Sequence, residues 1–294
     1  IDGQGQALAL NIDSMYQEGS WDDPNYNYRR HRSGKRPKLL NLKKCDKILL
    51  EGITFKNSAN WVLCFDICSN LTINRVTVDS DVYWNNDGMD IGDCRNVRIT
   101  DCYVNSADDG ICLKSHHKGH FNDSIYISNC TVRSSASAIK FGTASVGGFK
   151  NVKIENIYIF DTFRSAIALE SVDGGVLENI EISDITANNT GNAIFIKLGH
   201  RNTDGPVGSL KNVKIKNVVV QVPFEVPDLK YQIRGPELPF FHNVFPASIT
   251  GIPGHYVENV SLENIRIIYP GRANKGYAYI PLHRLDDVPE NASQ

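Results

Sequence analysis

The chain has 294 residues, of which 41% are hydrophobic, so it can bury a sizeable core. Its 31 basic and 33 acidic residues leave a net charge of −2, which argues against a general role on nucleic acid or on a membrane surface. No apolar run approaches the roughly 20 residues that a membrane span requires.

A short repeat runs along the chain from about residue 48. Each copy has a polar residue, usually Asn, followed by apolar-x-apolar, two polar residues and a second apolar pair. The first apolar residues are Ile48, Leu71, Val97, Ile125, Val152, Ile180, Val213 and Val260. Steps of 23 to 28 residues with period-two alternation are typical of a coil with three short strands per turn. The repeat therefore predicts an all-β fold, a right-handed parallel β-helix of about eight or more turns.

We expect one β-helix domain over residues 1–294, because the repeat covers most of the chain. Two longer steps of 33 and 47 residues predict inserted loops, the larger one near 223–257. The chain opens on a glycine-rich turn at Ile1–Gly5 without a signal peptide, and it stops at Gln294 without an evident cap. Since the ends of a solenoid must be covered, we expect both ends to be incomplete or capped by another chain.

Seven cysteines are an odd number, and none has the spacing of a zinc site. Three residues before the repeat anchors, Cys45, Cys68 and Cys94 share a mostly apolar column; five residues after them, Cys102 and Cys130 share another. This pattern predicts buried free thiols rather than disulfides, a metal site or a cofactor. The column of Asn residues predicts side-chain ladders at a turn.

A second apolar pair on each turn marks the strand that carries polar residues. Aligning Met89, Ile111 and the later pairs places Asp87 and Asp109 in one column and Asn86 and Asp108 in the next, with Asp90 facing outward. The acidic residues then gather on rungs about 4.8 Å apart.

Clustered carboxylates repel one another, so some of them should have raised pKa values. A protonated acid can donate its proton to a glycosidic oxygen while an ionised neighbour activates water. The alternative is a set of turn-capping Asp residues with calcium or nothing bound. The two motifs, Asn85–Gly88 and Asp108–Gly110, favour catalysis.

These motifs resemble two segments of glycoside hydrolase family 28, the polygalacturonases and rhamnogalacturonases. Asn85–Ile91 is similar to the family's Asn-Thr-Asp-Gly segment, and Ser106–Ile111 is similar to its paired-Asp segment. The resemblance extends to about residue 200. It implies a secreted or periplasmic hydrolase that cleaves a polysaccharide or oligosaccharide with inversion, with Asp108 as general acid and with Asp87 and Asp109 holding the water. The carboxyl groups are expected roughly 6.5–9.5 Å apart, or closer if two share the water.

Two departures from the family pattern bear on the substrate. Ser137 stands where the family has His, and Ala168-Leu169-Glu170 stands where it has the Arg-Ile-Lys that grips a uronate carboxylate. A glutamate in the lysine position would repel a uronate. The chain is therefore expected to be a divergent member that acts on something other than plain polygalacturonate.

Other polar and aromatic residues near these motifs are candidates for substrate binding: Asn85, Asp90, Lys114, His116, His117, Ser137, Lys140, Arg164, Glu170 and Trp84. Lys114 could pair with an anionic group or with Glu170, and Arg164 could equally be a solvent-facing turn residue. His116, His117 and His120 share a loop beyond Lys114. Aromatic rings give flat platforms for sugars, so Trp61, Tyr83 and Trp84 could stack on substrate, although Trp61 could equally be core.

Two other functions fit a β-helix. A pectate-lyase-like enzyme would hold calcium with carboxylates and use Lys114 or Arg164 as the base, giving unsaturated products. A non-catalytic carbohydrate-binding β-helix would bind oligosaccharide and release nothing.

Overall fold

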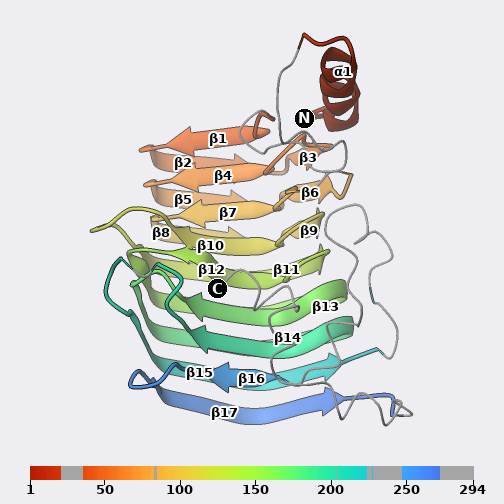
Figure 1. Ribbon diagram of the computed structural model, residues 1–294. Coiled ribbons are helices and arrows are strands. Elements are labelled where there is room, and N and C mark those ends of the chain that lie inside the picture. Colours follow the sequence, from red (N-terminus) through yellow and green to blue (C-terminus); the bar gives the residue numbers. More distant parts are fainter. Residues whose placement is uncertain (21–35, 83–84, 203, 224–226, 228–246, 272–294) are drawn as a thin grey trace.

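The computed structural model describes residues 1–20, 36–82, 85–202, 204–223, 227 and 247–271. In this part of the chain, seventeen parallel strands form one continuous sheet that is wound into a coil (Figure 1). Away from the two ends of the coil, each strand pairs with the strand one turn before and the strand one turn after it. The predicted right-handed parallel β-helix is confirmed.

Three strand faces repeat along the coil. The face that carries the candidate acids contains β1 (Leu40–Lys43), β4 (Leu63–Asp66), β7 (Met89–Gly92), β10 (Ile111–Ser115), β12 (Ile139–Ser145), the ends of β13 (Gly148–Ser171) and β14 (Val176–Leu198), and β16 (Ser248–Thr250). The other two faces contain β2 (Asp46–Glu51), β3 (Thr54–Lys56), β5 (Ser69–Asn74), β6 (Thr77–Ser80), β8 (Arg95–Thr100), β9 (Tyr103–Ser106), β11 (Asn122–Ser134), the starts of β13 and β14, β15 (Ser209–Gln221) and β17 (Val257–Ile268).

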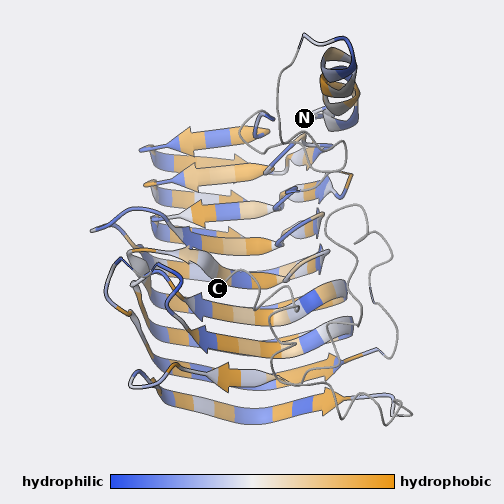
Figure 2. Cartoon of the chain, viewed as in Figure 1, coloured by the Kyte–Doolittle hydropathy of each residue, from blue (hydrophilic) through white to orange (hydrophobic). Residues whose placement is uncertain are grey.

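The apolar repeat sets the register of the coil. Each predicted anchor pairs with the next, from Ile48 with Leu71 through to Val213 with Val260. Hydrophobic and hydrophilic residues alternate along the strands (Figure 2), so one set of side chains fills the coil and the other faces outward. The core therefore runs as one stack of Val, Ile, Leu and Phe through the centre of the helix.

The cysteines of the apolar columns are free thiols where the sequence alignment placed them. All seven lie in the described part of the chain as free thiols. Cys68, Cys94, Cys102 and Cys130 are buried in the core, and Cys45 is half-buried at its edge. Their burial among aliphatic side chains matches the role of small hydrophobic residues.

The repeated asparagines mark a bend between two faces. Asn151, Asn179 and Asn212 all have a left-handed backbone, with φ between 53° and 59°. Asn tolerates this conformation better than other residues with a Cβ atom, which explains its recurrence at the bend. The amide of Asn179 donates to Asn151 at 3.1 Å, and that of Asn212 donates to Asn179 at 3.2 Å, so the predicted side-chain ladder is confirmed.

An α-helix that the repeat did not predict lies at the N-terminal end of the coil (Figure 1). It is α1, Gly5–Gln17, and Ile12 is its buried contact. The Gly5 N–H donates to the Asn57 carbonyl at 2.7 Å, and a Cβ at Gly5 would lie 2.5 Å from the Ser58 carbonyl, so the chain crosses the first rung at a glycine. None of the described segments forms a helix with the length and apolar character of a membrane span.

The larger predicted insertion ends earlier than residue 257. Ser248–Thr250 forms β16, which pairs with Phe195–Lys197 of β14 and so continues the face that carries the acids. A strand of three residues contains a single apolar side chain, Ile249, and gives too short an alternation to be recognised in the sequence. Residues 224–226 and 228–246 of the predicted insertion lie outside the described residues.

Candidate active site

The acidic motifs stack because the backbone of one rung bonds directly to the next. The Gly88 N–H donates to the Asp109 carbonyl at 2.8 Å, and the Gly110 N–H donates to the Ser137 carbonyl at 2.9 Å. A Cβ at Gly88 would lie 2.6 Å from the Gly110 carbonyl oxygen, which no side chain could tolerate. The close packing of the rungs therefore requires a glycine after Asp87. The same packing places Asp87, Asp109 and Ser137 in the predicted column.

Asp87, Asp108 and Asp109 form one carboxylate cluster. One oxygen from each lies within 4.8 Å of the others. This distance joins the nearest oxygens, whereas the roughly 6.5–9.5 Å expected for inverting hydrolases separates whole carboxyl groups, so inversion stays a prediction. The Asp109 N–H donates to Asp108 Oδ1 at 2.9 Å, the Ser137 N–H donates to Asp109 Oδ1 at 3.2 Å, and the amide of Asn85 lies 3.5 Å from Asp108 Oδ2.

Burial raises the pKa of every carboxyl in the cluster. It raises the pKa of Asp108 to about 6, with a further increase from the charge of Asp87, while Arg164 and Lys114 oppose it. It raises the pKa of Asp87 to about 7 against the charge of Lys114, and it raises the pKa of Asp109 against the charge of Lys140. The cluster can therefore hold a proton near neutral pH.

Lys114 forms an ion pair with one of these acids. Its Nζ lies 2.7 Å from Asp87 Oδ2 and 3.1 Å from Asp90 Oδ1, and it lies 4.6 Å from the centre of the Trp61 ring. These neighbours hold the pKa of Lys114 well above its usual value. Lys114 therefore pairs with Asp87 and Asp90 rather than with Glu170, and its pairing with an anionic group of a ligand stays a prediction.

Glu170 pairs with Lys140 on the neighbouring rung instead. The two side chains are only 0% and 2% exposed. The alignment of rungs predicted that Lys140, Glu170 and Asp90 point away from the core of the coil. None of the three belongs to the hydrophobic core cluster, as expected, but all three are buried rather than exposed. An alignment of strands shows which way a side chain leaves the coil, but not what covers it.

Arg164 and Ser137 both interact with the acids, Arg164 through its charge and Ser137 through its backbone N–H. Arg164 is half-buried, and its charge lowers the pKa of Asp108 and of Asp109, which places it beside the carboxylates rather than at a purely solvent-facing turn. Ser137 is buried and contributes its backbone N–H to Asp109. Two buried thiols also lie in the site: Cys112 Sγ is 3.8 Å from Asp109 Oδ2, and Cys64 Sγ is 3.8 Å from Asp90 Oδ2. Trp84 and Tyr83 lie outside the described residues.

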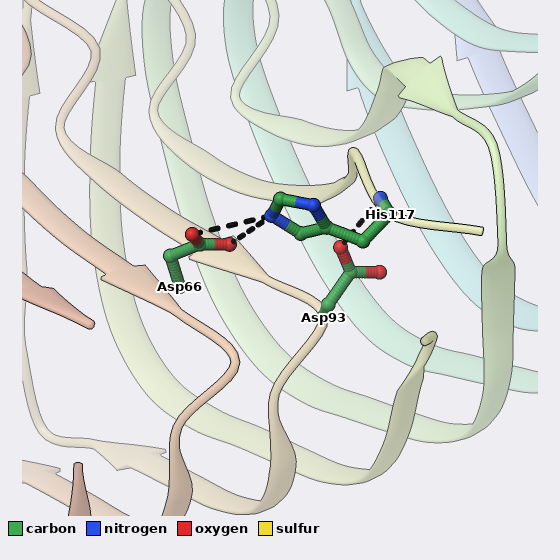
Figure 3. A group of neighbouring side chains, drawn as sticks. All are labelled: Asp66, Asp93 and His117. Carbon is green, nitrogen blue, oxygen red and sulfur yellow. Dashed lines mark hydrogen bonds and ion pairs between the residues drawn. The ribbon is translucent and has the colours of Figure 1, made fainter. Parts of the chain in front are cut away.

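The histidine loop lies beside the same rungs. The His116 ring stacks against Trp61 with centroids 6.4 Å apart, so Trp61 is at the site and only half-buried. His117 Nε2 lies 3.0 Å from Asp66 Oδ1 (Figure 3). Sequence reasoning missed Asp66, although it occupies the same register position on β4 as Gly92 on β7 and Lys114 on β10. It also missed Asp93, which directly follows β7.

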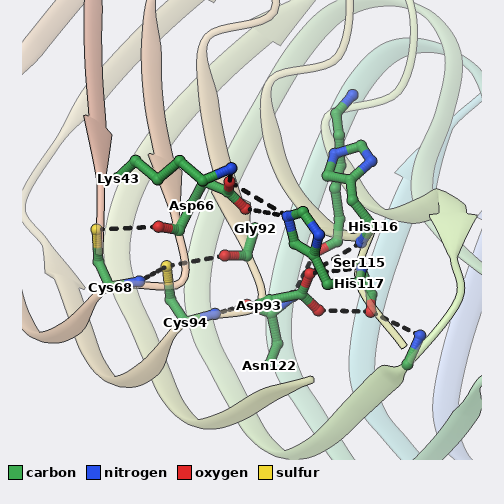
Figure 4. Close-up of polar contacts among 12 residues, drawn as sticks. Lys43, Asp66, Cys68, Gly92, Asp93, Cys94, Ser115, His116, His117 and Asn122 are labelled. Atoms are coloured by element: carbon green, nitrogen blue, oxygen red, sulfur yellow. Dashed lines mark hydrogen bonds and ion pairs between the residues drawn. The ribbon is translucent and has the colours of Figure 1, made fainter. Parts of the chain in front are cut away.

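In the described part of the chain, two groups of side chains have the ligand types of a metal site, but both already accept hydrogen bonds from the protein. In the group of Asp87, Asp108 and Asp109, the Lys114 ammonium already binds Asp87. In the group of Asp66, Asp93 and His117, Asp93 accepts bonds from the Ser115 hydroxyl and from the backbone N–H groups of His116 and His117 at 2.6–3.0 Å (Figure 4).

Comparison with known proteins assigns the family. The model of glycosyl hydrolases family 28 matches residues 1–222, and the chain therefore belongs to this family. A probable polygalacturonase from Vitis vinifera is 26% identical over 226 residues, which cover 75% of this chain and 37% of that protein. A probable endopolygalacturonase C from Aspergillus aculeatus is 28% identical over 161 residues, which cover 51% of this chain and 39% of that protein.

A solved structure supports the fold independently. An exopolygalacturonase from Thermotoga maritima superposes with a TM-score of 0.56 at 22% identity, over 76% of this chain and 54% of that one. The chain spans well under half the length of the two curated relatives above. The family membership and the fold are thus shown, and the low identities fit a divergent member.

Proposed function

We propose that the protein hydrolyses an O-glycosidic bond of a polysaccharide or oligosaccharide, using Asp87, Asp108 and Asp109. The observation that supports this is the cluster itself: three carboxylates with oxygens within 4.8 Å, raised pKa values, and one ammonium group bound to a single member. Such a set can keep one acid protonated while another stays ionised, which is what acid–base cleavage of a glycoside needs.

The ion pair between Lys114 and Asp87 supports one assignment of the catalytic roles. Burial raises the pKa of Asp87 further than that of Asp108, but a charged Lys114 at 2.7 Å favours an ionised Asp87. Asp108 accepts a backbone N–H from Asp109 and has no ammonium partner within 4.0 Å among the described residues, so it is the better site for the proton. We assign Asp108 as the general acid, which protonates the leaving oxygen, and Asp87 with Asp109 as the base that activates water.

The proposal includes inversion and a substrate other than plain polygalacturonate. A water held between two carboxylates attacks the sugar from the face opposite to the leaving group, which inverts the anomeric centre. Where relatives of this family carry a uronate clamp, this chain has Ala168, which is buried, and Glu170, which is neutralised by Lys140. That wall supplies no net positive charge for a second uronate. An extracellular or periplasmic location is part of the same proposal.

The test is a screen of plant and algal polysaccharides with product analysis. Asp108→Asn should lower turnover roughly 10²–10⁴-fold, because proton donation to the leaving group is lost. Asp101→Asn is the matched control, since Asp101 is exposed and aligns with Asn129 in the adjacent turn ladder. Proton NMR of the first product should show the inverted anomer; the retained anomer would contradict the roles given to Asp87 and Asp109.

Two outcomes would select another function. Calcium-dependent formation of unsaturated sugars, persisting in Asp108→Asn, would identify a pectate-lyase-like reaction. Saturable binding of an oligosaccharide with no release of product from any substrate would identify a non-catalytic carbohydrate-binding β-helix. Efficient cleavage of plain polygalacturonate would instead refute the interpretation of Ala168 and Glu170.

A further inference from the structure

A buried arginine, Arg36, contacts the first acidic motif from the segment that precedes β1. Its side chain is only 3% exposed. Its Nη1 donates to the Ala59 carbonyl at 2.7 Å, and its Nη2 donates to Asn85 Oδ1 at 3.2 Å. A planar guanidinium is a rigid fork of donors, so it can hold two acceptors in fixed positions. The hydrolysis proposed above assigns no role to this arginine.

The guanidinium of Arg36 fixes the orientation of the Asn85 amide. A guanidinium has N–H donors and no acceptor, so the atom of Asn85 that faces it must be the carbonyl oxygen. The amide nitrogen is then left for the proposed acid, and Asn85 Nδ2 lies 3.5 Å from Asp108 Oδ2. A flipped amide would place its oxygen against a carboxylate oxygen and its N–H groups against the guanidinium. Arg36 therefore selects the orientation that donates to Asp108.

The Asp108 carboxyl thus faces one donor on each oxygen. The Asp109 N–H donates to Oδ1 at 2.9 Å, and the Asn85 amide approaches Oδ2 at 3.5 Å. The second contact is long, and catalytic hydrogen bonds of a free enzyme often tighten only when substrate is bound. Two donors define the plane of the carboxyl group. Once Asp108 has given its proton to the leaving oxygen, the same donors stabilise the carboxylate that remains.

The backbone of Asp108 is connected to the same arginine through two buried asparagines. The Arg36 carbonyl accepts Asn60 Nδ2 at 3.0 Å, and the Asn60 carbonyl accepts Asn86 Nδ2 at 2.9 Å. The Asn86 carbonyl in turn accepts the Asp108 N–H at 3.3 Å. Because Asn60 and Asn86 are buried, water competes little for these bonds. The side chain and the backbone of the acid are therefore both held from Arg36.

We infer that Arg36 is a positioning residue for the general acid, and that it acts through Asn85 on Asp108. The inference rests on the proposed function for the role of Asp108. We call the chain of contacts from Arg36 through Asn85 to Asp108 the arginine relay. Asn85, which the sequence offered as a contact for substrate, then supports the acid.

The arginine relay has a measurable effect on the acid. A donor to the ionised form of a carboxyl lowers its pKa, so the relay limits the increase in the pKa of Asp108 that burial causes. The charges of Asp87, Arg164 and Lys114 also act on this carboxyl, and they remain when Arg36 is replaced. Loss of the relay should therefore raise the pKa of Asp108 further.

The test is the titration of Asp108 by carbon-13 NMR in protein labelled at the aspartate carboxyl carbon, with the signal assigned from Asp108→Asn. Arg36→Gln keeps a donor for the Ala59 carbonyl but can also turn an oxygen toward Asn85, so the amide is no longer held. The Asp108 midpoint should then rise by roughly 0.5–1.5 pH units, because one donor to the carboxylate is lost. Asn85→Gly should give a similar rise, since glycine keeps the left-handed backbone of Asn85, whose φ is 58°.

Combining the two changes separates the relay from a direct effect of the arginine charge. If Arg36 acts through Asn85, the double variant should titrate as Asn85→Gly does. Arg36→Lys, whose head group is also a donor without an acceptor, should return most of the midpoint shift. With substrate, Arg36→Gln should lower kcat roughly three- to thirtyfold and leave KM within about twofold. The basic limb of its pH profile should move up with the midpoint.

Arg133→Gln is the matched control. Arg133 is also buried, and its Nη1 donates to the Ser106 carbonyl at 3.1 Å and to Asn105 Oδ1 at 3.4 Å. Asn105 Nδ2 then donates to Asp79 Oδ1 at 2.8 Å, so the same order of residues ends on an exposed carboxylate outside the acid cluster. Arg133→Gln should leave the Asp108 midpoint within about 0.2 pH units.

Three results would overturn the inference: an unmoved midpoint in Asn85→Gly, an undiminished effect of Arg36→Gln in the Asn85→Gly background, or an equal shift with Arg133→Gln. Asn85→Gly changes a half-buried turn position, so it tests the last contact of the relay even if Arg36→Gln does not fold. The expected titrations without turnover in the unmodified protein would contradict only the proposed hydrolysis. Loss of turnover in Asp108→Asn, with no response of Asp108 to either change in the relay, would contradict only the relay.

Discussion

Replacing the proposed acid, Asp108, should stabilise the fold at neutral pH while it lowers activity by orders of magnitude. In the folded protein, burial and the neighbouring Asp87 raise the pKa of Asp108 from 3.8 to about 6. A raised folded-state pKa means that the protonated form is favoured by folding. This contribution is fully present below the unfolded pKa of about 4 and is lost as the pH rises through about 6. Above that pH the protein carries an ionised carboxylate in an unfavourable place.

The size of the effect follows from the shift. A difference of about two pH units corresponds to roughly 3 kcal/mol at most, and because Asp108 is partly exposed, we expect about 1–3 kcal/mol. Asn keeps an oxygen that can accept the Asp109 N–H, now 2.9 Å from Oδ1, and removes the charge. Asp108→Asn should therefore unfold at a temperature several degrees higher than the unmodified protein at pH 7.5, with a much smaller difference at pH 4.

The assay is thermal and urea unfolding of both proteins at pH 4.0 and 7.5, with Asp101→Asn as the exposed control. Asp101→Asn should change stability little at either pH. If Asp108→Asn is less stable at pH 7.5, or if its gain is the same at both pH values, the carboxyl is not strained in the folded protein and the argument for a raised pKa fails.

Three further predictions concern the neighbouring groups. Lys114→Met removes the ammonium that holds Asp87 ionised, so the acidic limb of the pH profile of kcat/KM should move up by roughly one to three pH units; an unmoved limb would exclude Asp87 as the base. Glu170→Gln removes the carboxylate that pairs with the buried Lys140 and should destabilise the protein by about 3–5 kcal/mol in urea unfolding. Lys140→Met combined with Glu170→Met should recover most of that loss, and additive losses would contradict the pairing. Alkylation after unfolding without reductant should modify all seven cysteines by mass spectrometry, and any disulfide-linked pair would count against the free thiols.

The sequence predicted the coil well because each rung repeats the same physical requirement. An inward-facing apolar residue must recur at every turn, so Val97 and Ile125 could be aligned without knowing the structure, and they pair as expected. The Asp87 and Asp109 column followed from the same alignment. The helix at Gly5–Gln17 escaped prediction because it occurs once and has no repeat to reveal it.

Contacts across the outer surface could not be read in the same way. Lys114 and Lys140 both stand on the outward positions of the same face, yet Lys114 turns to Asp87 and Lys140 to Glu170. A long flexible side chain can reach a partner on either neighbouring rung, so alignment alone leaves the pairing open. Asp66 was missed because its partner His117 comes from the loop after Lys114, and Lys43 was missed because its partner is Asp66.

These pairings have one consequence for catalysis. Lys140 and Glu170 form a buried pair across two neighbouring rungs, so the pair adds little net charge to the site. Lys114 bonds to Asp87 and also lies over the Trp61 ring. A charged Lys114 stabilises an ionised Asp87, and the charge of Asp87 in turn raises the pKa of Lys114. We therefore expect the Lys114–Asp87 pair to keep the proposed base ionised while Asp108, which lacks this ammonium partner, holds the proton that hydrolysis requires.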